Sequence, residues 1–144
     1  KFYMATKKKN RVMIADDEVH VRKYIKAVME RMNSEVVAEA VDGREAVEKF
    51  ARFKPNVLLL DINMPVKSGK TVLNEIMDRY PKAFVIMLTS LVDRETIEDC
   101  MALGASGYLR KDLSIDEMKS VIKQSWQTYK MARQQEQEQE QEQP

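Results

Sequence analysis

The sequence predicts a single doubly wound α/β domain, in which a five-stranded parallel sheet carries five helices on its two faces. Five short apolar runs provide the first indication, and they lie at residues 11–15, 35–40, 57–60, 83–88 and 107–109. The run at 57–60 is continuously apolar rather than alternating, which is typical of a strand covered on both faces. Apolar residues return at helical spacing after each run. Strict alternation of strands and helices favours a parallel sheet.

Each predicted helix has its own apolar stripe. After the strand at 11–15, the stripe consists of Val21, Tyr24, Ile25, Val28, Met29 and Met32. The next three stripes are Ala46, Val47 and Phe50; Val72, Leu73, Ile76, Met77 and Tyr80; and Ile97, Cys100 and Met101. The last consists of Met118, Val121, Ile122, Ser125, Trp126 and Tyr129, and that helix opens with Ser114 and Glu117 in the spacing of a capping box.

The composition is that of an ordinary globular chain. Of 144 residues, 44% are hydrophobic and 33% are charged, which suits one domain with a full core. No run approaches the ~20 apolar residues that cross a bilayer, so we expect no membrane insertion. Cys100 is the only cysteine, which excludes a disulfide framework and a cysteine-based zinc site. These features indicate a reducing, cytoplasmic setting.

The charges divide the chain into three parts: a basic arm at residues 1–10, a domain at 11–131 and a low-complexity tail at 132–144. Residues 1–11 carry five basic side chains and no acid, whereas residues 134–144 carry four glutamates. Subtracting these from the 24 basic and 23 acidic residues of the chain leaves 19 of each. The body is therefore neutral, and direct DNA binding has little support.

The two ends differ in what they indicate. Lys1, Phe2 and Tyr3 precede Met4, which is a candidate natural start. The Gln/Glu-rich tail has no apolar face with which to join a core, so we expect it to be disordered. The alternative is a solvated extension of the last helix, because glutamine and glutamate are good helix formers.

Polar side chains follow several of the predicted strands. Asp16 and Asp17 come directly after the first, Asp61 ends the third, Thr89 follows the fourth and Lys111 the fifth. Because open parallel sheets carry their chemistry at the carboxyl ends of the strands, we expect these groups to converge on one edge. Acids, a hydroxyl and a lysine together predict a cation site beside an anion site.

These five residues, with the Met-Pro pair at positions 64 and 65, resemble the receiver domain of two-component response regulators. The resemblance covers roughly residues 10–130, and single-domain chemotaxis-type regulators are closest in length. It implies a flavodoxin-like fold with strand order 2-1-3-4-5. It also implies a phosphorylation-dependent switch rather than an enzyme, with a sensor histidine kinase or phosphotransfer protein as donor and an unidentified protein as downstream effector.

The resemblance assigns roles at the site. Asp61 would be the phospho-acceptor, since a carboxylate can attack a phosphoryl group and hold it as an aspartyl phosphate. Asp16, Asp17 and Asp61, with the backbone carbonyl of Asn63, would bind Mg²⁺, a cation that prefers oxygen ligands.

A second set of implied roles concerns the phosphoryl group and its readout. Lys111 would neutralise a phosphate oxygen and Thr89 would donate a hydrogen bond to one. Movement of Thr89 toward the phosphoryl group would let Tyr108 turn inward and remodel the surface of the fourth helix, fifth strand and fifth helix.

Simpler interpretations exist for single residues. The acids at 16–18 would also complement a helix dipole, by ~0.3 to 1 kcal/mol per charge. His20 lacks partners for a zinc site or a catalytic dyad, and we expect it to face solvent. The joint pattern, rather than any one residue, carries the functional prediction.

Parts of the sequence also match three alternative functions. Residues 68–71, Ser-Gly-Lys-Thr, resemble the end of a phosphate-binding P-loop, but Met64 occupies the place of the first glycine. A haloacid-dehalogenase-type phosphatase also uses an aspartate nucleophile, magnesium, a hydroxyl and a lysine, yet its first motif is Asp-x-Asp and Asn63 stands at the third position. The third alternative is a receiver-like interaction domain that never takes phosphate.

One departure from the family pattern motivates that third alternative. Asp112 follows Lys111 where the family usually has a proline, which commonly carries a cis bond. A cis bond before a non-proline residue costs ~3 kcal/mol. We therefore expect a trans bond here, which would shift Lys111 or loosen the loop before the last helix.

Overall fold

The fold alternates strands and helices along the chain. The computed structural model describes residues 8–90 and 93–142; residues 1–7 of the predicted basic arm and Gln143 and Pro144 of the tail lie outside the described residues. The strands are β1 (Asn10–Ala15), β2 (Ser34–Ala40), β3 (Val57–Asp61), β4 (Val85–Thr89) and β5 (Gly107–Arg110). The helices are α1 (Val19–Arg31), α2 (Gly43–Phe53), α3 (Gly69–Arg79), α4 (Arg94–Ala102) and α5 (Ile115–Glu142).

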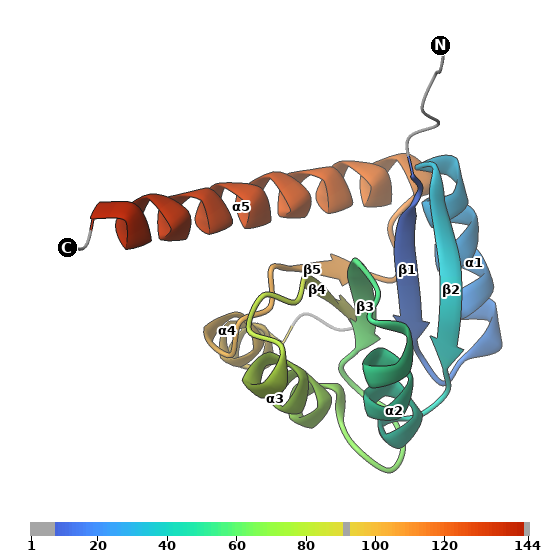
Figure 1. Cartoon of the computed structure of the whole chain (residues 1–144). Helices are drawn as coiled ribbons and strands as arrows, with labels where there is room; N and C mark the ends of the chain where they lie inside the picture. The colour runs from blue at the N-terminus through green and yellow to red at the C-terminus, as the bar shows by residue number, and fades with distance from the viewer. Residues whose placement is uncertain (1–7, 91–92, 143–144) are drawn as a thin grey trace.

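The strands form one parallel sheet in the order β2-β1-β3-β4-β5 (Figure 1). This confirms the predicted doubly wound α/β fold and its strand order. All four strand pairings are parallel. None of the described helices combines the length and the apolar character needed to cross a membrane.

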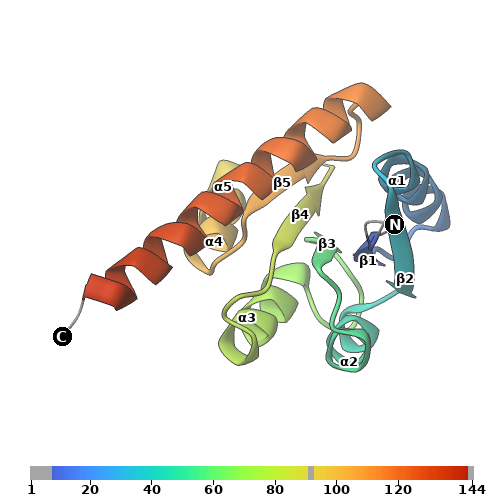
Figure 2. The same cartoon turned by 45° about the horizontal axis from the view of Figure 1, so that its top comes forward.

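Helices cover both faces of the sheet. One apolar cluster joins Leu58 and Leu60 of β3 to residues of α2, α3 and α4, and a second joins Leu59 to residues of α1 and α5. Figure 2 shows α1 and α5 on one side of the strands and α2 and α3 on the other. Because β3 is buried on both faces, its apolar run has no polar alternation.

The register of the strands brings their carboxyl ends to one edge. Ala15 of β1 pairs with Leu60 of β3. The next residue on each of these adjacent strands is an aspartate, so Asp16 and Asp61 are neighbours. On the other side of β3, Thr89 ends β4 and pairs with Arg110 of β5, next to Lys111. The sheet therefore places the predicted polar residues where its loops meet.

Element boundaries differ from the predictions by one or two residues. β4 begins at Val85 rather than at residue 83, because the Ala83 N–H donates to the Tyr80 carbonyl at 2.9 Å in the turn that follows α3. The ring centroid of Phe84 lies 5.3 Å from that of Trp126 and 4.9 Å from that of Tyr129. Phe84 thus leads into the strand, with its carbonyl bonded to Leu58 N–H and its ring packed against α5.

The capping box at the start of α5 is confirmed. Ser114 N–H donates to the Glu117 carboxylate at 3.0 Å, and Glu117 N–H donates to Ser114 Oγ at 3.2 Å. These reciprocal bonds satisfy backbone donors that a helix start leaves unpaired.

The expectation of a disordered tail was wrong. α5 continues through the Gln/Glu-rich segment to Glu142, and its last turns extend beyond the rest of the domain (Figure 1). Their described side chains are exposed, so no packing supports them. Intrinsic helix propensity, continuation from an already formed helix and the 2.8 Å ion pair between Arg133 and Glu136 account for the extension.

Removal of residues 135–144 should therefore lower the helical signal in far-UV circular dichroism without changing the thermal midpoint. The segment contributes helix but almost no buried surface, and surface residues of this kind contribute little to stability. An unchanged helical signal would contradict the extension. A large fall in the midpoint would contradict its isolation from the core.

Candidate functional site

Two aspartates are buried side by side at the carboxyl edge of the sheet. Asp16 follows β1 and is 0% exposed, and Asp61 ends β3 and is 3% exposed. Asp16 N–H donates to the Ala40 carbonyl of β2 at 3.0 Å, which ties this turn to the sheet. Neighbouring carboxylates in a dry environment repel each other and are poorly solvated, so the site requires positive charge.

Local backbone donors orient both carboxylates. Glu18 N–H donates to Asp16 Oδ1 at 2.8 Å, and Asn63 N–H donates to Asp61 Oδ1 at 3.2 Å. Each aspartate thus accepts a bond from the backbone two residues later, as in an Asx-turn. Asp16 therefore meets Lys111 with its other oxygen, Oδ2, whereas Asp61 Oδ1 takes both the Asn63 bond and the lysine contact.

Lys111 bridges the two acids. Its Nζ lies 2.7 Å from Asp16 Oδ2, 3.2 Å from Asp61 Oδ1 and 3.7 Å from the exposed carboxylate of Glu18. The lysine side chain is only 11% exposed, so solvent screens these ion pairs less than it would at the surface. Sequence-distant groups from β1, β3 and the end of β5 therefore meet at one point.

The pKa values follow from this arrangement. Burial, followed by repulsion from Asp16, raises the pKa of Asp61 to about 6, and Lys111 opposes the rise. For Lys111, burial by itself disfavours the charge, but Asp16 and Asp61 outweigh it and raise the pKa of the ammonium. At neutral pH the site therefore holds a carboxylate at Asp61 beside a charged lysine.

The donor set fits a hard cation. Asp16, Asp17 and Glu18 each offer a carboxylate oxygen, and these oxygens lie within 4.8 Å of one another. Asp16 Oδ2 is buried and accepts no well-aligned hydrogen bond from any described residue, so its charge is balanced through the ion pair with Lys111. Oxygen ligands with surplus negative charge suit Mg²⁺.

The remaining predicted residues differ in burial. Thr89 is buried at the end of β4, whereas the Asn63 side chain is exposed in the β3–α3 loop. Tyr108 is 44% exposed on β5, away from the carboxylates. It pairs with Met87, two residues before Thr89, so Tyr108 and Thr89 share one face of the sheet. His20 faces solvent as expected, 3.6 Å from the Glu18 carboxylate.

Asp112 leaves Lys111 in place. The described residues contain no cis peptide bond, which confirms the expected trans Lys111–Asp112 bond. Asp112 pairs with Arg110 at 2.6 Å, and Lys111 N–H donates to the Thr89 carbonyl at 2.9 Å. The lysine thus reaches both aspartates without a proline after it.

Sequence reasoning missed two supports of the site. Arg22 donates to the Asp16 carbonyl at 2.8 Å and to Glu39 of β2 at 3.0 Å, so it fixes the turn after β1. A Cβ at Gly69 would lie 1.9 Å from the Asp61 carbonyl oxygen, so only glycine allows α3 to start there. No pattern in the sequence indicated Arg22 or the close approach at Gly69.

Comparison with known proteins agrees with this geometry. Residues 12–123 match the response regulator receiver domain. The chain belongs to the response regulator receiver family. Its receivers are phosphorylation-dependent signalling switches, and the haloacid-dehalogenase alternative gains no support from these matches.

Relatives of this receiver include proteins of very different length. It is 33% identical over 115 residues to the chemotaxis protein CheY of Listeria monocytogenes, covering 80% of this chain and 97% of that protein. It is 39% identical over 126 residues to a protein-glutamate methylesterase/protein-glutamine glutaminase of Archaeoglobus fulgidus, covering 85% of this chain but 36% of the relative. The chain thus spans about a third of that curated relative.

Solved structures show the same fold. CheY in the CheX-CheY-BeF3-Mg complex from Borrelia burgdorferi matches with a TM-score of 0.78 and 28% identity, covering 81% of this receiver and 89% of that chain. The response regulator domain of Thermotoga maritima CheB matches with a TM-score of 0.75 and 29% identity, covering 85% and 98%.

Asp61→Asn should stabilise this receiver above pH 6 in metal-free buffer, by roughly 2 kcal/mol. The folded state keeps the Asp61 proton up to about pH 6, whereas an ordinary aspartate loses it near 3.8. Folded protein therefore binds more protons in that interval, and its free energy of unfolding falls as pH rises through it. Asp61→Asn removes the titrating carboxyl, so the free energy of unfolding of the variant does not fall through this pH interval for that reason.

Urea unfolding at pH 4 and pH 7.5, in the presence of a chelator, measures the effect. The two proteins should be closest in stability at pH 4. Asp78→Asn removes an exposed carboxylate from α3 and should follow the wild type at both pH values. An Asp61→Asn protein that is less stable than the wild type at pH 7.5 would refute the account.

Proposed function

We propose that Asp61 accepts a phosphoryl group from the phosphohistidine of a sensor histidine kinase or a phosphotransfer protein. The observation that carries the proposal is the burial of Asp61 beside Asp16, with Lys111 Nζ 3.2 Å from its carboxylate. A carboxylate oxygen of Asp61 forms a bond to phosphorus as the phosphorus–nitrogen bond breaks. The electron pair of the broken bond stays on the donor imidazole, which leaves.

The carboxylates hold the cation that this step needs. Asp16, Asp17 and Asp61, with the backbone carbonyl of Asn63, are the proposed Mg²⁺ ligands. When bound, Mg²⁺ neutralises charge between the Asp61 carboxylate and the incoming phosphoryl oxygens. The close carboxylate oxygens of Asp16 and Asp17 and the poorly satisfied Asp16 Oδ2 support these two ligands, and the shared contact with Lys111 supports Asp61 beside them.

Lys111 and Thr89 complete the phosphoryl site in this proposal. The Lys111 ammonium, now balancing Asp16 and Asp61, is within reach of a phosphoryl oxygen on Asp61 after a small side-chain movement. Thr89 ends the neighbouring strand, and its hydroxyl donates a hydrogen bond to another phosphoryl oxygen. Both groups act through electrostatics and position. The only reaction that they assist in this proposal is the receiver's own phosphorylation and dephosphorylation.

The readout uses the sheet face shared by Thr89 and Tyr108. Movement of Thr89 toward the phosphoryl group frees space on that face, and Tyr108, now 44% exposed, turns inward. The surface formed by α4, β5 and α5 then changes its affinity for a protein effector. We propose no direct DNA contact, because the body is electrically neutral, and we place the switch in the cytoplasm.

The switch unit is residues 11–131 in this proposal, with the basic arm and the Gln/Glu-rich end of α5 as appendages. All proposed site residues lie within it. The described side chains after Arg133 are exposed.

Incubation with Mg²⁺ and acetyl phosphate should add the mass of one phosphoryl group to the intact protein. Asp61→Asn should abolish the adduct, because the amide is not a nucleophile for this reaction, and Asp78→Asn should retain it. Equal labelling of the wild type and Asp61→Asn, or no labelling with several small donors, would refute the proposal. Steady phosphate release from unrelated monoesters would favour a phosphatase instead.

Asp16→Asn should weaken Mg²⁺ binding by at least about tenfold, the usual scale for loss of one charged ligand interaction of ~1.4 kcal/mol. The affinity follows from the dependence of the thermal midpoint on Mg²⁺ concentration, because the stabilisation rises as RT ln(1 + c/Kd), where c is the concentration of free Mg²⁺. Asp112→Asn serves as the control, because Asp112 is near Lys111 but pairs with Arg110. Equal affinities in the two variants would exclude Asp16 as a ligand.

A further inference from the structure

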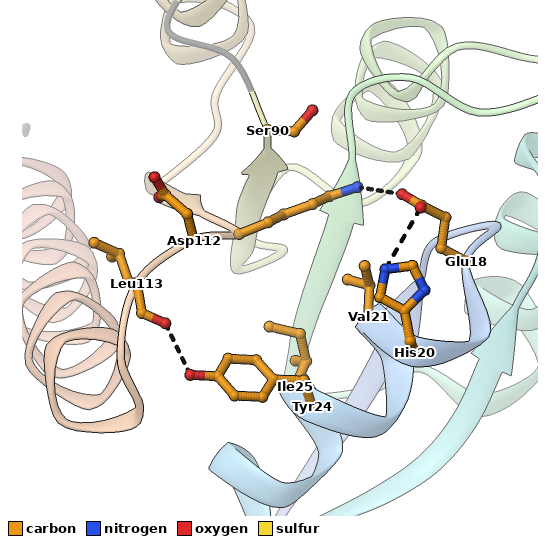
Figure 3. A pocket seen from close by; sticks show the side chains of 9 residues that line it. Glu18, His20, Val21, Tyr24, Ile25, Ser90, Asp112 and Leu113 are labelled. Atoms are coloured by element: carbon orange, nitrogen blue, oxygen red, sulfur yellow. Dashed lines mark hydrogen bonds and ion pairs between the residues drawn. The ribbon is translucent and has the colours of Figure 1, made fainter.

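A groove of about 560 Å³ lies between α1 and the segment that joins β5 to α5. Figure 3 shows Tyr24 reaching from α1 toward Leu113 on the opposite wall, with Glu18 and His20 at the other end of the groove. Lys111 also lines it. The groove therefore joins the charged centre to a contact between α1 and the joining segment.

Tyr24 holds the joining segment to α1. Its hydroxyl donates to the Leu113 carbonyl at 2.8 Å, across 89 residues of sequence (Figure 3). The ring is 36% exposed at the edge of the apolar stripe of α1, and the hydroxyl projects to the groove. One side chain thereby connects a rigid helix to the backbone two residues after Lys111.

Leu113 also packs against the apolar cluster that α1 shares with α5, but, apart from those of the Lys111 ammonium, the other polar bonds of residues 111–113 are made to the strands or within the segment. Lys111 N–H is bonded to the Thr89 carbonyl at 2.9 Å, but Leu113 N–H reaches the Arg110 carbonyl only at 3.5 Å. The Arg110–Asp112 ion pair has side chains that are 49% and 65% exposed, and exposed pairs constrain a loop weakly. Beside this apolar packing, the Tyr24 bond is the hydrogen bond from α1 that fixes the backbone of Leu113 in the described structure.

We propose that Tyr24 is a positioning residue for Lys111: by fixing Leu113 against α1, its hydroxyl holds the lysine backbone where Nζ reaches both Asp16 and Asp61. This inference rests on the proposed phosphoryl transfer to Asp61. Lysine has a long flexible side chain, so a shift of its backbone changes the positions that the ammonium group occupies. Tyr24 touches no reacting atom and acts only through this segment.

Tyr24→Phe tests the role, because it removes the hydroxyl and keeps the ring in the stripe of α1. Tyr129→Phe is the matched control, since the Tyr129 hydroxyl also donates to a backbone carbonyl, that of Lys82, far from the site. Labelling by acetyl phosphate should slow about two- to tenfold in Tyr24→Phe, the factor expected for one hydrogen bond. Tyr129→Phe should label at the wild-type rate.

Mg²⁺ affinity, measured by isothermal titration calorimetry, separates positioning of Lys111 from general damage. The proposed metal ligands are untouched by Tyr24→Phe, and a less constrained lysine competes less for Asp16 and Asp61. The affinity should therefore stay unchanged or rise while the labelling rate falls. A fall in both would mean that the acid cluster itself is distorted, and it would overturn the inference.

The outcomes also separate this inference from the proposed function. If the wild type labels at Asp61 and Tyr24→Phe labels as fast as Tyr129→Phe, the positioning role is wrong and phosphoryl transfer stands. If the wild type itself takes no phosphoryl group at Asp61, the proposed function fails and the inference fails with it.

Discussion

The burial of two carboxylates at adjacent strand ends is the constraint on which the rest of this receiver depends. Asp16 and Asp61 are almost inaccessible to water, and their mutual repulsion helps to raise the pKa of Asp61 to about 6. Lys111 offsets part of this cost in the described structure. A site that already balances two anions with one cation is ready to exchange charge partners, which is what binding a metal ion and a phosphoryl group requires.

The surrounding fold supports this charge arrangement from several directions. Backbone N–H groups of the β1–α1 and β3–α3 loops orient the carboxylates, and Arg22 ties the Asp16 carbonyl to β2. Gly69 lets α3 begin against the Asp61 carbonyl. The lysine is held differently, through the backbone of a short segment that α1 restrains at Leu113. Rigid acids with a more adjustable cation suit a site whose state must change.

Sequence patterns predicted most of this fold because the sheet is buried on both faces. The run at 57–60 has no polar interruption, and apolar stripes identify all five helices. Predictions failed where a different force decided the outcome. A turn closed by the Ala83–Tyr80 hydrogen bond delays the start of β4, and helix propensity extends α5 through a segment that buries nothing. An expectation based on burial alone could not anticipate the second case.

The sequence by itself determined the chemistry that is available: three aspartates, a threonine and a lysine, each following a recognisable strand. Parallel strands in one sheet oblige such residues to share an edge, so their convergence was predictable. Only the tertiary structure decided that Lys111 lies between Asp16 and Asp61, that Tyr108 stands outward, and that Tyr24 reaches Leu113. The first and the last of these are contacts between residues far apart in the chain, and the second is the direction of one exposed side chain. Side-chain direction across such distances depends on packing, which no local pattern encodes.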